Sequence, residues 1–139
     1  MDSPELRDAL HVELTRFVRA AGPRRVFTPT FHLGWPGGPD DGRLSVPDER
    51  GFDVGLRADL VERWLEERSA ERVPRPWLTR GGELVATDVD VAWAAASRAG
   101  FARHGLAYPG FRVVTLGGWF DVESAEVTRA RVRRRRRVR

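Results

Sequence analysis

The strongest constraint on the fold is a strand, helix, strand pattern between residues 75 and 118. Two apolar runs, "RPWLTRGG" and "FRVVTLGG", end in paired glycines, and the segment "TDVDVAWAAASRAGFARHG" lies between them. The six alanines around Trp93 allow this segment to pack closely on a sheet as a helix. A crossover of this length predicts a right-handed βαβ unit whose two strands are parallel.

The segments before residue 75 add further elements. Residues 2–21 have a helical apolar stripe, Asp2 or Ser3 can cap it, and Gly22 and Pro23 end it. Residues 24–33 predict a strand in which Pro29 marks an edge position or a bulge, followed by a mobile or functional loop at 34–43. A second helix is predicted from about 56 to 70, with a charged outer face.

The C-terminal part predicts a β-hairpin. Gly117 and Gly118 fit a two-residue turn, which would place Arg112 opposite Glu123 and Val113 opposite Val122. The following "EVTRARVR" alternates, with three small or apolar residues on one face and arginines on the other, so it predicts a last strand that continues to residue 133. The apolar-side residues are Thr128, Ala130 and Val132, and the arginines are Arg129, Arg131 and Arg133.

We therefore expect an α/β protein, with α+β as the alternative. Residues 1–133 would form one small domain, with a mixed sheet, about three helices, and a C-terminal βαβ unit followed by a β-hairpin. Residues 134–139 would form an arginine-rich tail. The length of 139 residues suits a single hydrophobic core.

The composition excludes several kinds of active site. The chain has no lysine, so a Walker A loop and Schiff-base catalysis are excluded, and no cysteine, so a thiol nucleophile is excluded. Neither GxSxG nor GxGxxG occurs. The three histidines, His11, His32 and His104, lack metal-site spacing, and His104 suits a helix C-terminus. We expect no cofactor and no metal, and a protein that is not an enzyme is favoured.

Two acidic motifs have structural interpretations that outweigh metal binding. "TDVD" at 87–90 could hold magnesium, but Thr87 or Asp88 would also cap the helix that starts there, and Asp90 would favour its dipole. "PDDG" at 39–42 is typical of a turn before it is typical of a metal loop.

A short internal echo predicts a ligand cleft. "LTRGGEL" at 78–84 and "VTLGGWF" at 114–120 would both lie at the carboxyl ends of neighbouring parallel strands, where open α/β sheets bind ligands. Arg80 could hold an anion there, and Glu83 could act as an acid or base. Each glycine pair can equally be only a tight turn. The cleft candidates are Thr79, Arg80, Gly81, Gly82, Glu83, Thr115, Gly117, Gly118 and Trp119.

Charge divides the chain into an acidic body and a basic end. Residues 1–128 carry 16 arginines against all 20 acids, and residues 129–139 add eight arginines. The absence of lysine, asparagine and isoleucine indicates a GC-rich, bacterial type of coding sequence, which weakens arginine content as a functional sign. No apolar run is long enough to span a bilayer, and no leader is evident, so a cytoplasmic protein without membrane contact is expected.

Three functions remain open. In the first, the arginine-rich end contacts polyanions, most simply nucleic acid backbone without strong sequence specificity. In the second, the tail docks an acidic protein, with Trp35 and Trp119 as anchors; in the third, the cleft binds a small ligand or acts as an enzyme. The tail could also fold back on the acids from Glu62 to Glu71. The polyanion candidates are Arg129, Arg131, Arg133, Arg134, Arg135, Arg136, Arg137 and Arg139.

Overall fold

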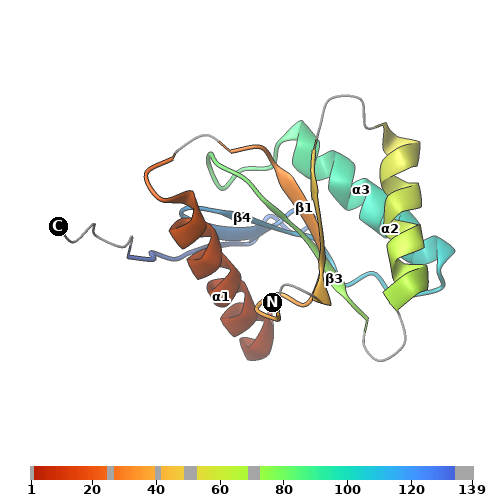
Figure 1. The fold of residues 1–139 in the computed structure, drawn as a ribbon, viewed down its shortest axis with the longest axis horizontal. Coiled ribbons are helices and arrows are strands. Elements are labelled where there is room, and N and C mark those ends of the chain that lie inside the picture. The colour runs from red at the N-terminus through yellow and green to blue at the C-terminus, as the bar shows by residue number, and fades with distance from the viewer. Residues whose placement is uncertain (1, 25–26, 40–41, 49–52, 69–72, 134–139) are drawn as a thin grey trace.

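The described residues of the computed structural model form three helices and a six-stranded mixed sheet (Figure 1). They cover 2–24, 27–39, 42–48, 53–68 and 73–133. The helices and strands in chain order are α1 (Pro4–Ala21), β1 (Thr30–Gly34), β2 (Leu44–Pro47), α2 (Val54–Arg68), β3 (Arg75–Thr79), α3 (Asp88–Arg103), β4 (Arg112–Thr115), β5 (Gly118–Asp121) and β6 (Val127–Arg129). The predicted α/β class is confirmed.

The sheet is built around the predicted βαβ unit. Its strand order is β2-β1-β3-β4-β5-β6, and β3 and β4 are parallel neighbours joined through α3. The other neighbouring strands are antiparallel. In Figure 1, α1 lies on one face of the sheet, and α2 and α3 lie together on the other.

Each face of the sheet has its own apolar cluster. On the α2 and α3 side, Phe31 stacks on Trp93 with the ring centroids 4.2 Å apart, and both side chains are fully buried. On the α1 side, the apolar stripe of the helix packs on large side chains from three central strands. These strand residues are Trp77, Val114 and Trp119. Burial on both faces explains the near-continuous apolar character of the central strands.

The helix ends follow the predicted capping chemistry. The Ser3 hydroxyl accepts a hydrogen bond from the Leu6 N–H at 3.2 Å, and α1 is followed by Gly22 at φ 57°. Thr87 and Asp90 form a reciprocal capping box at the start of α3. His104 is the C-cap residue that directly follows α3. The capping interpretation of "TDVD" is therefore confirmed.

The predicted hairpin register is wrong by two residues. Thr115 pairs with Gly118, so the turn consists of Leu116 and Gly117, and Arg112 faces Asp121. Gly118 lies in β5, where a Cβ would collide with the carbonyl oxygen of Thr128 in the adjacent β6. The second glycine is thus needed for the close approach of a strand and not for the turn.

The last strand is shorter than predicted. β6 ends at Arg129, which pairs with Gly118, the first residue of β5, so no strand remains beside the residues that follow. A single further hydrogen bond joins the Ala130 N–H to the Gly117 carbonyl at 3.0 Å. The alternation nevertheless continues to residue 133, because Ala130 and Val132 pack against the α1-side cluster.

The first part of the sheet also differs from the prediction. Pro29 precedes β1 and is not an edge residue, since β1 lies between β2 and β3. The edge strand is β2, which the sequence pattern did not indicate. The loop between β1 and β2 is attached to α1 by the buried Glu13. The Glu13 carboxylate accepts hydrogen bonds from Arg43 at 2.7 Å and from the Gly37 N–H at 2.8 Å. Residues 40 and 41 of the "PDDG" turn lie outside the described residues.

A polar cluster closes the end of α3 against the hairpin. The Tyr108 hydroxyl donates a hydrogen bond to Glu123 at 2.5 Å, and Arg98 pairs with the same carboxylate at 3.4 Å. Burial of the phenol raises the pKa of Tyr108 well above its usual value, and the hydrogen bond to Glu123 raises it further.

We predict an alkaline loss of stability that comes from this one side chain. Tyr108 is the sole tyrosine, and the chain has neither lysine nor cysteine, so no other side chain titrates between about pH 9.5 and 12. Above about pH 10 the unfolded phenol loses its proton while the folded one keeps it, so the free energy of unfolding falls. The slope cannot exceed about 1.4 kcal/mol per pH unit, because only one proton is involved, and partial exposure of the phenol lowers it further. Urea denaturation across this range should show the slope, and the variant Tyr108→Phe should abolish it.

We predict that Gly100→Ala destabilises the packing of α3 on α2. A Cβ at Gly100 would lie 2.7 Å from Cγ1 and 2.9 Å from Cβ of Val61, both of which are held in the core. The overpacking, typically about 1–3 kcal/mol, exceeds the roughly 1 kcal/mol that alanine adds to a helix. Urea denaturation should show a net loss of about 1 kcal/mol. Gly55→Ala on α2 is the matched control, because it meets only ordinary contacts; equal stability of the two variants would contradict the prediction.

Candidate functional site

The carboxyl ends of β3 and β4 meet at a cleft, in the region where the sequence predicted one. The cleft has a volume of about 370 Å³. Four of the nine predicted residues line it, and Arg129 from β6 lines it as well. The four are Gly82, Glu83, Thr115 and Gly117. The parallel pairing of the two strands brings these residues together, although more than 30 positions separate the two segments.

The predicted residues that do not line this cleft have other surroundings. Thr79 lies on the α1 face, where its hydroxyl is 2.9 Å from His32 Nε2. Trp119 is 4% exposed and packs beneath α1, so its ring is not an exposed anchor. The Gly81 carbonyl accepts a hydrogen bond from Arg80, and Gly118 pairs with Arg129.

Arg80 organises the loop that forms one wall of the cleft. Its guanidinium is buried and makes a two-point ion pair with Asp90, with N–O distances of 2.9 and 2.8 Å. It also donates to three carbonyls of the loop, those of Gly81 at 2.8 Å, Glu83 at 3.1 Å and Val85 at 2.8 Å. These five hydrogen bonds match the five N–H donors of an arginine. Arg80 therefore holds the loop in place, and the cation that faces the cleft is Arg129.

The cleft combines three polar side chains. Thr115 is 1% exposed, and its hydroxyl oxygen accepts the Gly117 N–H at 3.2 Å. Glu83 and Arg129 are exposed, and within the described ranges neither forms an ion pair with another side chain. Two glycines leave room beside them. The site therefore offers a buried hydroxyl, a carboxylate and a guanidinium within one hollow.

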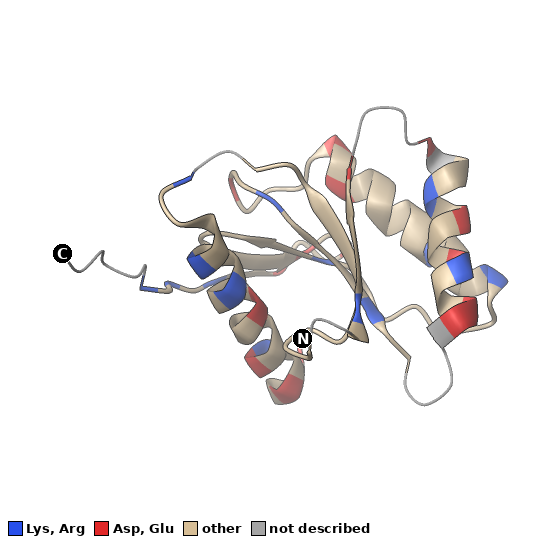
Figure 2. Ribbon diagram, in the orientation of Figure 1, with Lys and Arg blue, Asp and Glu red and all other residues tan. Residues whose placement is uncertain are grey.

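The described arginines of the chain end form a row on one side of the chain. Arg129, Arg131 and Arg133 are exposed, while Ala130 and Val132 between them face the core. Arg131 and Arg133 border a further hollow of about 590 Å³ next to Val18 of α1. Figure 2 shows this basic segment leaving the body beside α1. The other predicted arginines, Arg134, Arg135, Arg136, Arg137 and Arg139, lie outside the described residues.

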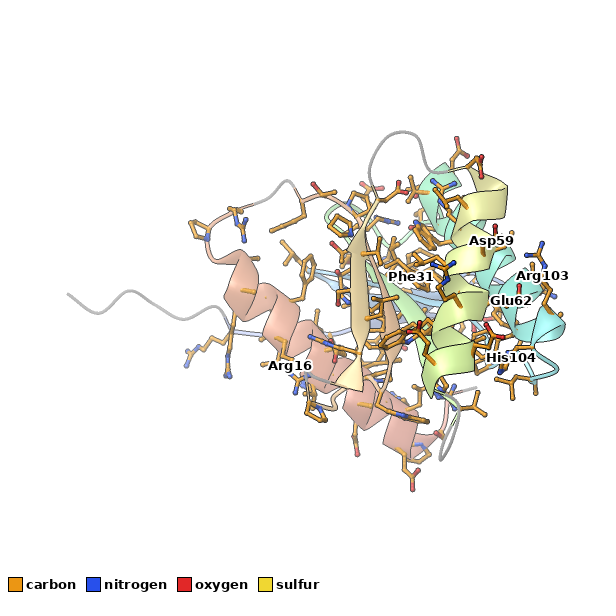
Figure 3. The ribbon with its side chains drawn as sticks, turned by 45° about the vertical axis from the view of Figure 1, so that its right-hand side comes forward. Arg16, Phe31, Asp59, Glu62, Arg103 and His104 are labelled. Atoms are coloured by element: carbon orange, nitrogen blue, oxygen red, sulfur yellow. The ribbon has the colours of Figure 1, made fainter. Side chains whose placement is uncertain are left out.

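Two acids of α2 have an arginine partner on α3. Figure 3 shows Asp59 and Glu62 close to Arg103 of α3, and Arg103 pairs with them at 3.2 and 3.6 Å. Arg16 of α1 lies far from them in the same view. Glu71 is outside the described residues. Glu62 thus has a partner within the helical layer.

A hydrogen-bonded triad on the α1 face was not predicted. His32 contacts Ser45 through Nδ1 at 2.7 Å and Thr79 through Nε2 at 2.9 Å, and its ring stacks on Trp77. The partners are 13 and 47 positions from His32, and only the pairing of β1 with both β2 and β3 brings them together. No local spacing in the sequence could have revealed it.

Comparisons of the chain with protein-family models, with curated proteins and with solved structures found no match. Among the described residues, no helix has both the length and the apolar character needed to cross a membrane.

We predict that Asp90→Asn strongly destabilises the protein. The change keeps the size of the side chain but leaves the buried Arg80 without its charged partner, which typically costs about 3–5 kcal/mol. The matched control is Asp88→Asn, since Asp88 is an exposed acid in the same helical turn, and its loss should cost less than about 1 kcal/mol. Both values are measured by urea denaturation. Similar losses in the two variants would show that Arg80 does not depend on Asp90.

Proposed function

We propose that this protein is a non-enzymatic binding module whose arginine-rich C-terminal segment contacts polyanions, in the first place the phosphate backbone of nucleic acid. The observation that carries the proposal is the row of Arg129, Arg131 and Arg133, which are exposed and have no acidic partner among the described residues. Guanidinium groups in this state are free to bind phosphate oxygens in pairs of hydrogen bonds.

The row contrasts with arginines elsewhere in the body. Arg43, Arg57 and Arg112 are mostly buried, and each lies within 3.0 Å of a carboxylate oxygen. The body carries a net charge of −4, and the whole chain reaches +4 only through the arginines from residue 129 onward. An acidic body repels a polyanion, so contact is directed to the arginine-rich end.

The composition supports backbone contact over base reading. The chain has neither asparagine nor glutamine, the side chains that bind adenine through paired hydrogen bonds. Within the described ranges every aromatic side chain is at least partly buried, which disfavours base stacking as the main contact. Phosphate contacts dominate such a complex, and its affinity depends on salt and only weakly on sequence.

We predict that Arg129→Gln, Arg131→Gln and Arg133→Gln together weaken nucleic acid binding and lower its salt dependence. Removal of three phosphate contacts from duplex DNA should reduce the slope of log affinity against log salt by about 2.7. Fluorescence anisotropy at several salt concentrations measures both quantities. Removal of residues 134–139 should reduce the slope further, because five more arginines are lost.

The control removes the same charge from α2 and α3, away from the chain end. Arg63, Arg98 and Arg103 are exposed on α2 and α3, and their replacement by glutamine should leave the slope nearly unchanged. Equal effects of the two triple variants would mean that net charge alone, and not the row, determines binding. Absence of binding by the unaltered protein to DNA, RNA and heparin at low salt would refute the proposal. In that case, binding to an acidic protein surface becomes the favoured function.

A further inference from the structure

We propose that the cleft at the ends of β3 and β4 binds a ribonucleoside 5′-phosphate with a free 2′,3′-diol, as found at the 3′ end of RNA. The inference rests on the proposed function, because the phosphate partner is the first arginine of the row. It assigns to the cleft the recognition of a sugar, a role that differs chemically from the backbone contact made by the arginine row.

The position of Arg129 connects the row to the cleft. Arg129 lines the cleft together with Thr115 and Glu83, and it is also the first of the three exposed arginines. A backbone held by Arg133 and Arg131 therefore arrives at the cleft with its next phosphate at Arg129. Successive alternate residues of an extended chain are at most about 7 Å apart, which suits contacts to neighbouring phosphates.

Glu83 selects the kind of nucleotide that can follow. Its carboxylate accepts hydrogen bonds but donates none, and in dinucleotide-binding folds an acidic residue binds the ribose hydroxyls in this way. An internal nucleotide would bring a second phosphate next to this carboxylate, and like charges repel. A terminal ribose brings two hydroxyl donors and no further phosphate. The carboxylate therefore favours a chain end with a free diol.

Thr115 and the glycines complete the site. The Thr115 oxygen accepts the Gly117 N–H, and no acceptor for its own hydroxyl proton occurs among the described residues, so this buried donor is available to a sugar oxygen. A Cβ at Gly117 would approach no atom closer than 3.9 Å, which leaves the cleft open at this point. The cleft volume of about 370 Å³ lies in the range of small-molecule sites.

The test compares RNA oligonucleotides that differ only at the 3′ end. Fluorescence anisotropy is measured with 5′-labelled octauridylate that ends in a ribose diol, in a 2′-deoxyribose or in a 3′-phosphate. The unaltered protein should bind the diol about tenfold more tightly than the other two, because hydrogen bonds to a charged group are lost or a repulsion is introduced. Uridine 5′-monophosphate is used as a competitor, to show whether a free nucleotide occupies the same site.

Two variants identify the cleft as the source of the preference. Glu83→Ala removes the carboxylate, and Gly117→Leu fills the space beside Thr115; each should reduce the preference below about twofold. Gly55→Leu is the control for an added side chain, because Gly55 is exposed in the first turn of α2, which contributes no residue to the cleft, and this variant should keep the preference. If both cleft variants lose the preference and uridine 5′-monophosphate competes with the oligonucleotide on the unaltered protein, the cleft binds both free and chain-terminal nucleotides.

The two proposals fail in different ways. Equal affinity for all three ends, with salt-dependent binding still weakened by the arginine row variant, overturns the cleft assignment and leaves the proposed function intact. A preference that survives both Glu83→Ala and Gly117→Leu also overturns it. If no oligonucleotide binds at low salt, the proposed function fails, and direct titration with uridine 5′-monophosphate decides on the cleft: the absence of binding there overturns this inference as well.

Discussion

The buried ion pair between Arg80 and Asp90 determines the geometry of the cleft at the ends of β3 and β4. It joins the residue after β3 to the first turn of α3, and the remaining donors of Arg80 bind the carbonyls of the intervening loop. A buried pair of this kind is a weak source of net stability, because both charges lose their hydration. Its effect is to select one arrangement: the loop cannot move without leaving a charge unpaired in the interior. The wall of the cleft is therefore rigid, and the exposed charges Glu83 and Arg129 act against a fixed background.

The chain end alternates between residues that pack on the core and exposed arginines. Ala130 and Val132 cover the cluster beneath α1, and the residues between them must point away from it. Arginines at those positions cost nothing in packing, because their side chains are exposed. The alternation thus has a structural cause, whereas the choice of arginine at every outward position has none in the fold. This difference makes the row, and not simply the high arginine content, the argument for polyanion binding.

The sequence predicted those features that depend on local chemistry. The βαβ unit, the caps at Ser3 and Thr87, and the apolar stripe of α1 follow from periodicity and capping rules that act within a few residues. The sequence did not predict the features that depend on contacts between segments far apart in the chain. The hairpin register depends on the approach of β6 to Gly118, the edge strand β2 depends on its pairing with β1, and the hydrogen bonds of His32 depend on three strands. For the cleft, the sequence predicted the location but gave the anion-binding role to Arg80, because nothing local shows that Asp90 and three carbonyls use all its donors.

The different environments of Arg80, which is buried, and Arg129, which is exposed, have a physical cause. An arginine that directly follows a buried strand enters the interior, where it must be fully hydrogen-bonded, so it becomes part of the framework. An arginine on the outward face of an edge strand stays hydrated and loses little when it binds a phosphate. A weakly selective binding surface requires the second kind, since its contacts must form and break readily as salt and partner change. Only at Arg129 do the two environments meet: its guanidinium is exposed, yet it borders a cleft whose shape is held by Arg80. The proposed preference for a chain end therefore requires Arg129, which connects the row to Glu83 and Thr115 in the cleft.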